Sequence, residues 1–213
     1  MALYLDSANL SEAQTAMAWG WVKGITTNPK ILAQRQEPPH QVLRELRSLC
    51  RGEIYYQLMS TTVDAMVQEG FAAHRILGAQ TVLKIPAIVT GFEALSQLSP
   101  AIDCSVTGIY SPAQALVAAE GGAKYAIAYV NRATRLLGDG ILLVKSMADV
   151  LAGSETTILA ASIKSPEEAV AAINAGALHL TMPLEMLQKM TFHGLSEQTV
   201  QDFNQEGRGL SLD

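Results

Sequence analysis

The sequence predicts a (β/α)8 TIM barrel of the α/β class, built as a single domain with an extra C-terminal helix. Short apolar runs rich in β-forming residues alternate with helical stretches, and this alternation produces a parallel sheet covered by helices. Eight such runs are present, and eight strands close a barrel. The length of 213 residues, with 49% hydrophobic and 16% charged residues, suits one domain with a large core.

The expected strands follow one another through residues 1–190, and no linker or low-complexity tract divides them. In order they are Leu3–Asp6, Gly24–Thr27, Ile54–Leu58, Thr81–Pro86, Ile102–Val106, Tyr125–Val130, Thr157–Ala161 and His179–Met182. Their number matters more than any one boundary, because boundaries read from sequence drift by about two to four residues.

Two of the intervening helices have clear start signals. Ser111, which is followed by proline, can cap a helix over Ala113–Glu120. Ser165 and Glu168 have the spacing of a capping box, in which each side chain accepts from the other residue's backbone N–H. This box predicts a helix over Ala169–Asn174.

A further helix is expected after the third strand. Ser60 or Thr61 can cap it, and it continues through Arg75 to end near Gly78. Other helix ends that need a left-handed residue are marked by glycines. These are Gly121, Gly122 and Gly176.

The chain continues past the eighth strand. Pro183–Met190 is expected to form a helix, and the polar segment Ser196–Gln205 then extends beyond what barrel closure requires. Such a segment can fray or dock on a neighbouring subunit. Docking is favoured because Val200 and Phe203 are spaced as one face of a helix. We interpret residues 191–213 as a helical tail that packs on another copy.

Composition argues against several classes of function. The net charge of −5, the pI near 5.4 and the lack of a basic stripe argue against nucleic acid as a partner. No signal peptide and no apolar window of about 18 residues is present, so no membrane association is expected. Cys50 and Cys104 form no disulfide framework, and the histidines have no metal-ligand spacing. We expect a cytoplasmic protein without a bound metal.

Polar residues gather at the C-terminal ends of the expected strands, where barrels of this class place their active sites. They are Asp6, Thr26, Thr27, Asn28, Gln57, Ser105, Thr107, Tyr129, Asn131, Arg132, Ser162 and Lys164. A purely structural barrel needs few of them. The sequence therefore predicts a functional site at this mouth.

Lys84 is the outlier among the strand residues. Strand alternation points it towards the barrel interior if Leu83 and Ile85 face the helices. Burial disfavours the ammonium form and lowers the pKa, and a neutral amine is the nucleophile that Schiff-base chemistry requires. The alternative is a lysine whose stem packs while its head reaches water. The surrounding polar ring favours the functional interpretation.

Three residues late in the chain can form a seat for a phosphate group. Arg132 offers a bidentate donor fork, Ser162 a hydroxyl and Lys164 a point charge, and the late loops of barrels often bind phosphate. A solvated loop charge is the alternative for the arginine.

Two further residues have a structural alternative. Tyr129 is either a core aromatic or a residue whose hydroxyl faces the mouth of the barrel, and Asp6 is either a helix cap or a site residue. For both residues, the interpretation that places them at the mouth is favoured.

Several longer motifs stand at the same strand ends. They are Tyr4-Leu5-Asp6-Ser7-Ala8-Asn9, Gly24-Ile25-Thr26-Thr27-Asn28-Pro29, Lys84-Ile85-Pro86, Tyr129-Val130-Asn131-Arg132 and Ala160-Ala161-Ser162-Ile163-Lys164. Together they resemble the transaldolase family, specifically the small subfamily that includes fructose-6-phosphate aldolase. The resemblance runs from Leu3 to about Met190, and the Thr-Thr-Asn-Pro and Lys-hydrophobic-Pro motifs are its most specific parts.

The resemblance implies roles for the central residues of the site. In such enzymes Lys84 would form an imine with the ketose carbonyl. Asp6 and Asn28 would hold hydroxyls of the dihydroxyacetone moiety, and Thr107 would orient a catalytic water.

The resemblance also implies what the protein binds and how it assembles. Arg132 and Ser162 would receive the phosphate of a small sugar-phosphate substrate. No cofactor is implied, because the imine itself activates the substrate. The chain would form a homo-oligomer, a pentamer or decamer, with its C-terminal helix packed on a neighbour.

Two positions distinguish activities within the family. By this resemblance, transaldolases proper have glutamate at the position of Gln57 and phenylalanine at that of Tyr129, whereas fructose-6-phosphate aldolases have glutamine and tyrosine. A glutamate can shuttle a proton, whereas a glutamine only holds a water, so the tyrosine hydroxyl would supply the acid/base function. The pair in this chain favours the aldolase.

The sequence thus predicts a Schiff-base aldolase that cleaves or forms the C3–C4 bond of fructose 6-phosphate or a related ketose. The expected catalytic residues are Lys84, Tyr129, Gln57, Thr107 and Asp6. The expected substrate-binding residues are Thr26, Asn28, Asn131, Arg132, Ser162 and Lys164.

Three alternatives remain open. A true transaldolase would transfer the dihydroxyacetone unit between sugar phosphates of the pentose phosphate pathway. An isomerase or epimerase would need a carboxylate base, for which only Asp6 and Asp103 lie near, and would leave Lys84 unexplained. A non-catalytic barrel would bind sugar phosphates even without the lysine amine.

Overall fold

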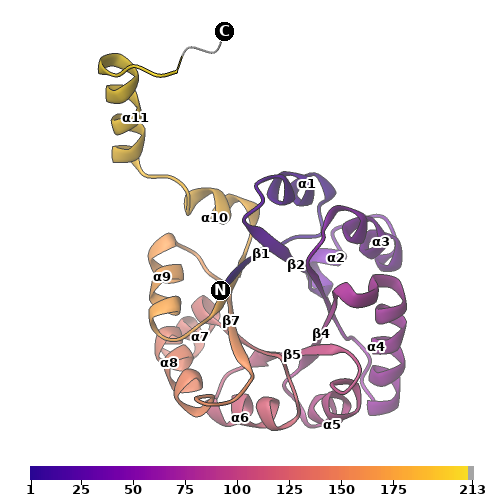
Figure 1. Cartoon of the computed structure of the whole chain (residues 1–213). Helices are drawn as coiled ribbons and strands as arrows, with labels where there is room; N and C mark the ends of the chain where they lie inside the picture. Colours follow the sequence, from indigo (N-terminus) through magenta and orange to yellow (C-terminus); the bar gives the residue numbers. More distant parts are fainter. Residues whose placement is uncertain (211–213) are drawn as a thin grey trace.

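The computed structural model describes residues 1–210, which include a closed barrel of eight parallel strands arranged in sequence order (Figure 1). The strands are β1 (Ala2–Asp6), β2 (Val22–Thr26), β3 (Glu53–Gln57), β4 (Thr81–Pro86), β5 (Asp103–Ile109), β6 (Tyr125–Tyr129), β7 (Thr157–Ala161) and β8 (His179–Met182). Every expected strand is present, so the predicted barrel is confirmed. The boundaries differ little: β5 continues past Val106, and Val130 begins a helix instead of ending β6.

Helices form the outer layer around the strands (Figure 1). They are α1 (Leu10–Ala18), α2 (Pro29–Leu32), α3 (Pro39–Leu49), α4 (Val63–Leu77), α5 (Val89–Leu98), α6 (Pro112–Glu120), α7 (Val130–Leu137), α8 (Gly140–Val150), α9 (Pro166–Asn174), α10 (Leu184–Lys189) and α11 (Gly194–Glu206). A short 3₁₀ turn, η1 (Gly78–Gln80), connects α4 to β4. No helix within residues 1–210 is long and apolar enough to cross a membrane.

The helix caps follow the sequence signals with three corrections. In the Ser165–Glu168 box, the Glu168 carboxylate accepts from the Lys164 backbone N–H instead of that of Ser165. Ser111 and Ser165 cap α6 and α9 as expected. Thr62, rather than Ser60 or Thr61, caps α4, because its hydroxyl accepts from the backbone N–H three residues later. The end of α6 uses the second glycine of its pair. Gly122 has the left-handed φ of +83°, whereas its predecessor keeps a helical φ of −76°.

The barrel strands divide their side chains between two apolar layers. Leu83 and Ile85 point outwards and are fully buried against the helices. Val82, Ile127 and Leu159 point inwards and fill the barrel. Because side chains alternate along a strand, Lys84 shares the inward direction with Val82.

A tyrosine-rich cluster closes the base of the barrel, at the N-terminal ends of the strands. Tyr4, Tyr55 and Tyr125 donate to the carboxylate of Glu53 at 2.7, 3.1 and 2.8 Å. Lys124 pairs with the same carboxylate at 2.8 Å. Burial alone would raise the pKa of Glu53, but hydrogen bonds from Lys124, Tyr4 and Tyr125 outweigh it, and the net shift is downward.

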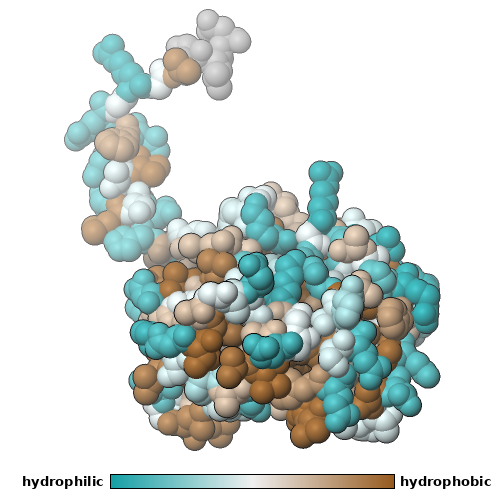
Figure 2. Space-filling model, turned by 60° about the horizontal axis from the view of Figure 1, so that its bottom comes forward, coloured by the Kyte–Doolittle hydropathy of each residue, from teal (hydrophilic) through white to brown (hydrophobic). Residues whose placement is uncertain are grey.

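The C-terminal helix α11 stands clear of the barrel body (Figures 1 and 2). It has no buried residue, and Leu195 and Phe203 are each 72% exposed. The predicted helix is therefore present, while its docking on a neighbouring copy stays a prediction. The last residues of the expected tail, 211–213, lie outside the described residues.

Candidate active site

Lys84 lies inside the barrel, in the middle of β4. It is only 4% exposed, and its Nζ donates to the backbone carbonyl of Thr27 at 3.0 Å. Burial lowers the pKa of this amine, and the negative charge of Asp6 opposes that shift without cancelling it. The alternative interpretation, with the lysine head reaching water, is therefore wrong.

A cavity of about 620 Å³ opens at the C-terminal ends of the strands, directly above Lys84. The predicted residues that line it are Asp6, Asn28, Gln57, Lys84, Tyr129, Arg132, Ser162 and Lys164. Thr26, Thr107 and Asn131 are not part of its lining. Thr26 and Thr107 form hydrogen bonds with the lining residues Asp6 and Tyr129. The Asn131 side chain donates to Glu168 of α9.

Asp6 belongs to a chain of hydroxyl contacts that crosses from β1 to β2 and β8. Thr26 donates to its carboxylate at 2.8 Å and also lies 2.6 Å from the hydroxyl of Thr181. Thr181 lines the cavity and was not expected from the sequence, although its alternation with Leu180 in β8 could have placed it inside. Asp6 is not a helix cap, because Asn9 caps α1.

Tyr129 faces the cavity with its hydroxyl fixed. The hydroxyl lies 2.6 Å from that of Thr107, which is 4% exposed, and the Arg132 guanidinium stacks 4.8 Å from the centre of the tyrosine ring. Burial raises the pKa of Tyr129, and the charge of Asp6 adds to this. Thr107 and Arg132 pull the pKa down but do not outweigh the burial.

Asn28 both caps a helix and lines the cavity. Its Oδ1 caps α2 by accepting from the backbone N–H groups of Lys30 and Ile31 at 3.0 and 3.1 Å. The residue also lines the cavity. The cap therefore holds the asparagine at the mouth through its oxygen.

Ser162, at the end of β7, has an unusual backbone. Its φ is +62°, the only positive value outside glycine within residues 1–210. Its carbonyl accepts from the Asn131 backbone N–H at 3.2 Å. The Asn131 side chain in turn donates to Glu168 of α9 at 3.4 Å. Asn131, expected to bind substrate, is thus engaged with the protein.

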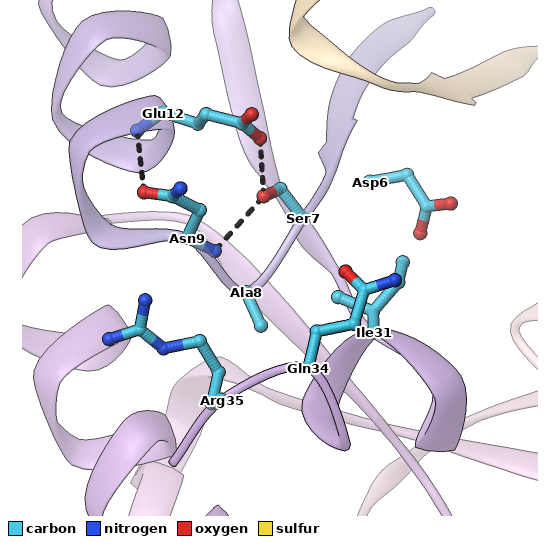
Figure 3. A pocket seen from close by; sticks show the side chains of 8 residues that line it. All are labelled: Asp6, Ser7, Ala8, Asn9, Glu12, Ile31, Gln34 and Arg35. Carbon is cyan, nitrogen blue, oxygen red and sulfur yellow. Dashed lines mark hydrogen bonds between the residues drawn. The ribbon is translucent and has the colours of Figure 1, made fainter. Parts of the chain in front are cut away.

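A second, polar hollow of about 280 Å³ adjoins the cavity and shares Asp6 and Ile31 with it (Figure 3). Ser7 donates to Glu12 at 2.6 Å and accepts from the Asn9 backbone N–H at 3.0 Å. These bonds stabilise the turn that directly follows Asp6, the last residue of β1.

Comparisons with known proteins identify the family. The family model described as "Transaldolase/Fructose-6-phosphate aldolase" matches residues 3–211. The chain belongs to this family. It is 34% identical to a probable transaldolase of Symbiobacterium thermophilum and 36% identical to one of Desulforudis audaxviator, each time over 95% of both chains. The protein is an enzyme of the transaldolase and aldolase type.

Solved structures show the same architecture in more distant proteins. An inosine 5′-monophosphate dehydrogenase from Legionella pneumophila superposes with a TM-score of 0.60 at 15% identity. The match covers 85% of this chain and 58% of the dehydrogenase chain. At that identity the likeness concerns the barrel alone. The family assignment therefore rests on the sequence relatives.

Proposed function

We propose that this member of the transaldolase family is a Schiff-base aldolase that cleaves or forms the C3–C4 bond of fructose 6-phosphate or a related ketose. The observation that carries the proposal is the buried amine of Lys84 beneath the cavity, with a lowered pKa. A neutral amine in such a place is suited to attack a carbonyl. The imine it forms supplies the electron sink for the reaction.

The cycle begins with attack of the Lys84 Nζ on the C2 carbonyl of the ketose. Loss of one water gives a protonated imine, and the negative charge of Asp6 favours this cation. A base then removes the C4 hydroxyl proton. The electrons of the C3–C4 bond flow into the iminium, the aldehyde leaves, and an enamine of dihydroxyacetone remains on the lysine.

Tyr129 is the proposed acid and base. Its hydroxyl is held 2.6 Å from that of Thr107, so a proton can pass between the tyrosine and a water on the threonine. Protonation of the enamine at C3 and addition of water at C2 then release dihydroxyacetone and restore the amine.

The choice between release and transfer rests on Gln57. In the sheet register Gln57 pairs with Lys84, on the same face of adjacent strands. An amide can hold a water there but cannot shuttle a proton. We therefore propose aldolase release as the main activity. Transfer to an aldose phosphate is the second candidate, favoured by the relatives named as probable transaldolases.

Arg132, Ser162 and Lys164 line the cavity and are the proposed seat of the substrate phosphate. Two cations and a hydroxyl together match a dianionic group. The substrate class is accordingly a sugar phosphate.

Reductive trapping tests the proposed function. The protein is incubated with dihydroxyacetone or fructose 6-phosphate, reduced with borohydride and mapped by mass spectrometry. The expected adduct lies on Lys84, with Lys30 of the same cavity as an internal control. Turnover with an unmodified Lys84 would exclude the imine. Free dihydroxyacetone, measured with and without glyceraldehyde 3-phosphate, then separates release from transfer.

We also propose that α11 packs on a neighbouring copy in a homo-oligomer. Its support is the exposure of Leu195, Val200 and Phe203 on an otherwise polar helix. Light scattering measures the molar mass of the full chain and of a Phe203→Ser variant. We expect an oligomer for the full chain and a smaller mass for the variant. A monomer mass for both would refute the proposal.

A further inference from the structure

A carboxylate outside the cavity joins the two segments that carry the proposed phosphate seat. Glu168, in the first turn of α9, accepts from the Lys164 backbone N–H at 2.6 Å and from the Asn131 side-chain amide at 3.4 Å. Lys164 follows β7, and Asn131 follows β6. One side chain therefore bridges the segment of Ser162 to the segment of Arg132.

This contact departs from the helix cap that the sequence predicts. Ser165 does accept from the Glu168 backbone N–H, at 3.1 Å. In a capping box the glutamate would return to the backbone N–H of the serine. Here it reaches one residue further back, to Lys164. The reciprocal half of the predicted box is wrong, and the carboxylate accepts from Lys164 and Asn131 instead.

The backbone of Ser162 depends on support from both sides. A left-handed φ in a residue with a Cβ persists only where neighbouring contacts over-determine it. The Ser162 carbonyl is held by the Asn131 backbone N–H, and the N–H of Lys164, two residues later, is held by Glu168. Glu168 also accepts from the Asn131 side chain. It therefore contacts both Lys164 and the residue whose backbone N–H holds the Ser162 carbonyl.

We propose that Glu168 is a positioning residue that keeps Ser162 and Arg132 in register for a substrate phosphate and thereby sets the preference for phosphorylated over neutral substrates. This proposal rests on the proposed function. The negative charge of Glu168 itself opposes a phosphate, so its benefit comes from geometry. A glutamine, which keeps an acceptor oxygen without the charge, should preserve that benefit.

The test compares glyceraldehyde 3-phosphate with glyceraldehyde as acceptors of dihydroxyacetone. In Glu168→Ala the KM for the phosphorylated aldehyde should rise about tenfold, which is about 1.4 kcal/mol. Its kcat, and kcat/KM for the neutral aldehyde, should stay within about twofold of the wild type. Glu168→Gln should restore KM to within about threefold. Glu167→Ala is the matched control, since Glu167 is an exposed carboxylate on the same turn.

A binding measurement independent of turnover uses inorganic phosphate as the probe. Phosphate should raise the melting temperature of the wild type and of Glu167→Ala, and at the same concentration should protect Glu168→Ala less. If Glu168→Ala does not fold, Glu168→Asp, which keeps the charge but shortens the reach, should show the same rise in KM.

Two results would overturn the proposal. One is an equal loss of kcat/KM for both aldehydes, which indicates general damage to the barrel. The other is an unchanged KM together with unchanged phosphate protection. If the wild type converts neither aldehyde and forms no Lys84 adduct, the proposed function fails. In that case phosphate protection alone decides the role of Glu168.

Discussion

Replacing Glu53 by glutamine should destabilise the barrel at its base. The carboxylate accepts from Tyr4, Tyr55, Tyr125 and Lys124. A hydrogen bond to a charged group contributes roughly 1.5–3 kcal/mol. The glutamine oxygen can retain one or two of these donors, while its NH₂ group faces the others. The expected loss is therefore about 3 kcal/mol, or a fall in melting temperature of about 6–12 °C for a domain of this size.

Urea unfolding followed by circular dichroism measures this loss. Asp103→Asn is the matched control, because Asp103 pairs with the same lysine but its side chain is 50% exposed. An exposed pair contributes at most about 1 kcal/mol, so that variant should stay close to the wild type. Neither change should alter kcat by more than about twofold, since both residues lie at the end of the barrel opposite the cavity.

The pH dependence gives a second check on Glu53. Its folded-state pKa lies below the unfolded value of about 4.3. Its contribution to stability is therefore complete above the unfolded pKa and is lost as the pH falls through the folded pKa. The stability gap between the wild type and Glu53→Gln should be constant near neutral pH and shrink below about pH 4. A gap under about 0.5 kcal/mol at pH 7, a size usual for surface substitutions, would refute this reasoning.

The remaining predictions concern the cavity. Lys84→Met should abolish the borohydride adduct and lower kcat roughly 10³-fold or more, as expected for loss of a nucleophile; residual trapping at the same peptide would contradict it. Because burial lowers the pKa of Lys84, the rate of adduct formation should rise with pH and level off below the usual lysine value of about 10.4. A titration limb at the usual value would count against the buried amine. Tyr129→Phe should slow dihydroxyacetone release about 10²–10⁴-fold while the Lys84 adduct still forms, measured by trapping and release in parallel. Gln57→Glu should raise transfer and lower release, and no change in either would remove the role assigned to Gln57.

The sequence was sufficient for the fold and for the centre of the site because both depend on local periodicity. Alternation within β4 places Lys84 on the inward face, and that placement is confirmed. The chain order of strand ends likewise predicted which residues share the mouth, since parallel strands end on one side. Most of the expected residues do line the cavity.

What the sequence could not predict depends on contacts between distant segments. Thr181 meets Thr26 across 155 residues of chain, and no local pattern signals that pair. Glu168 matched a local motif, yet its carboxylate accepts from Lys164 and from Asn131 of α7, 37 residues earlier in the chain. The cap of α4 moved to Thr62 because several hydroxyl residues in a row satisfy the same local rule.

The tyrosine cluster around Glu53 has a consequence for the order of events. Because this cluster fills the base of the barrel, we expect aldehydes to enter and leave through the mouth at the C-terminal strand ends. The first aldehyde product would then leave before a second aldehyde enters. In the transfer reaction, where the acceptor aldehyde binds only after the first aldehyde has left, substituted-enzyme kinetics, seen as parallel lines in double-reciprocal plots, then follow from the architecture as well as from the covalent chemistry.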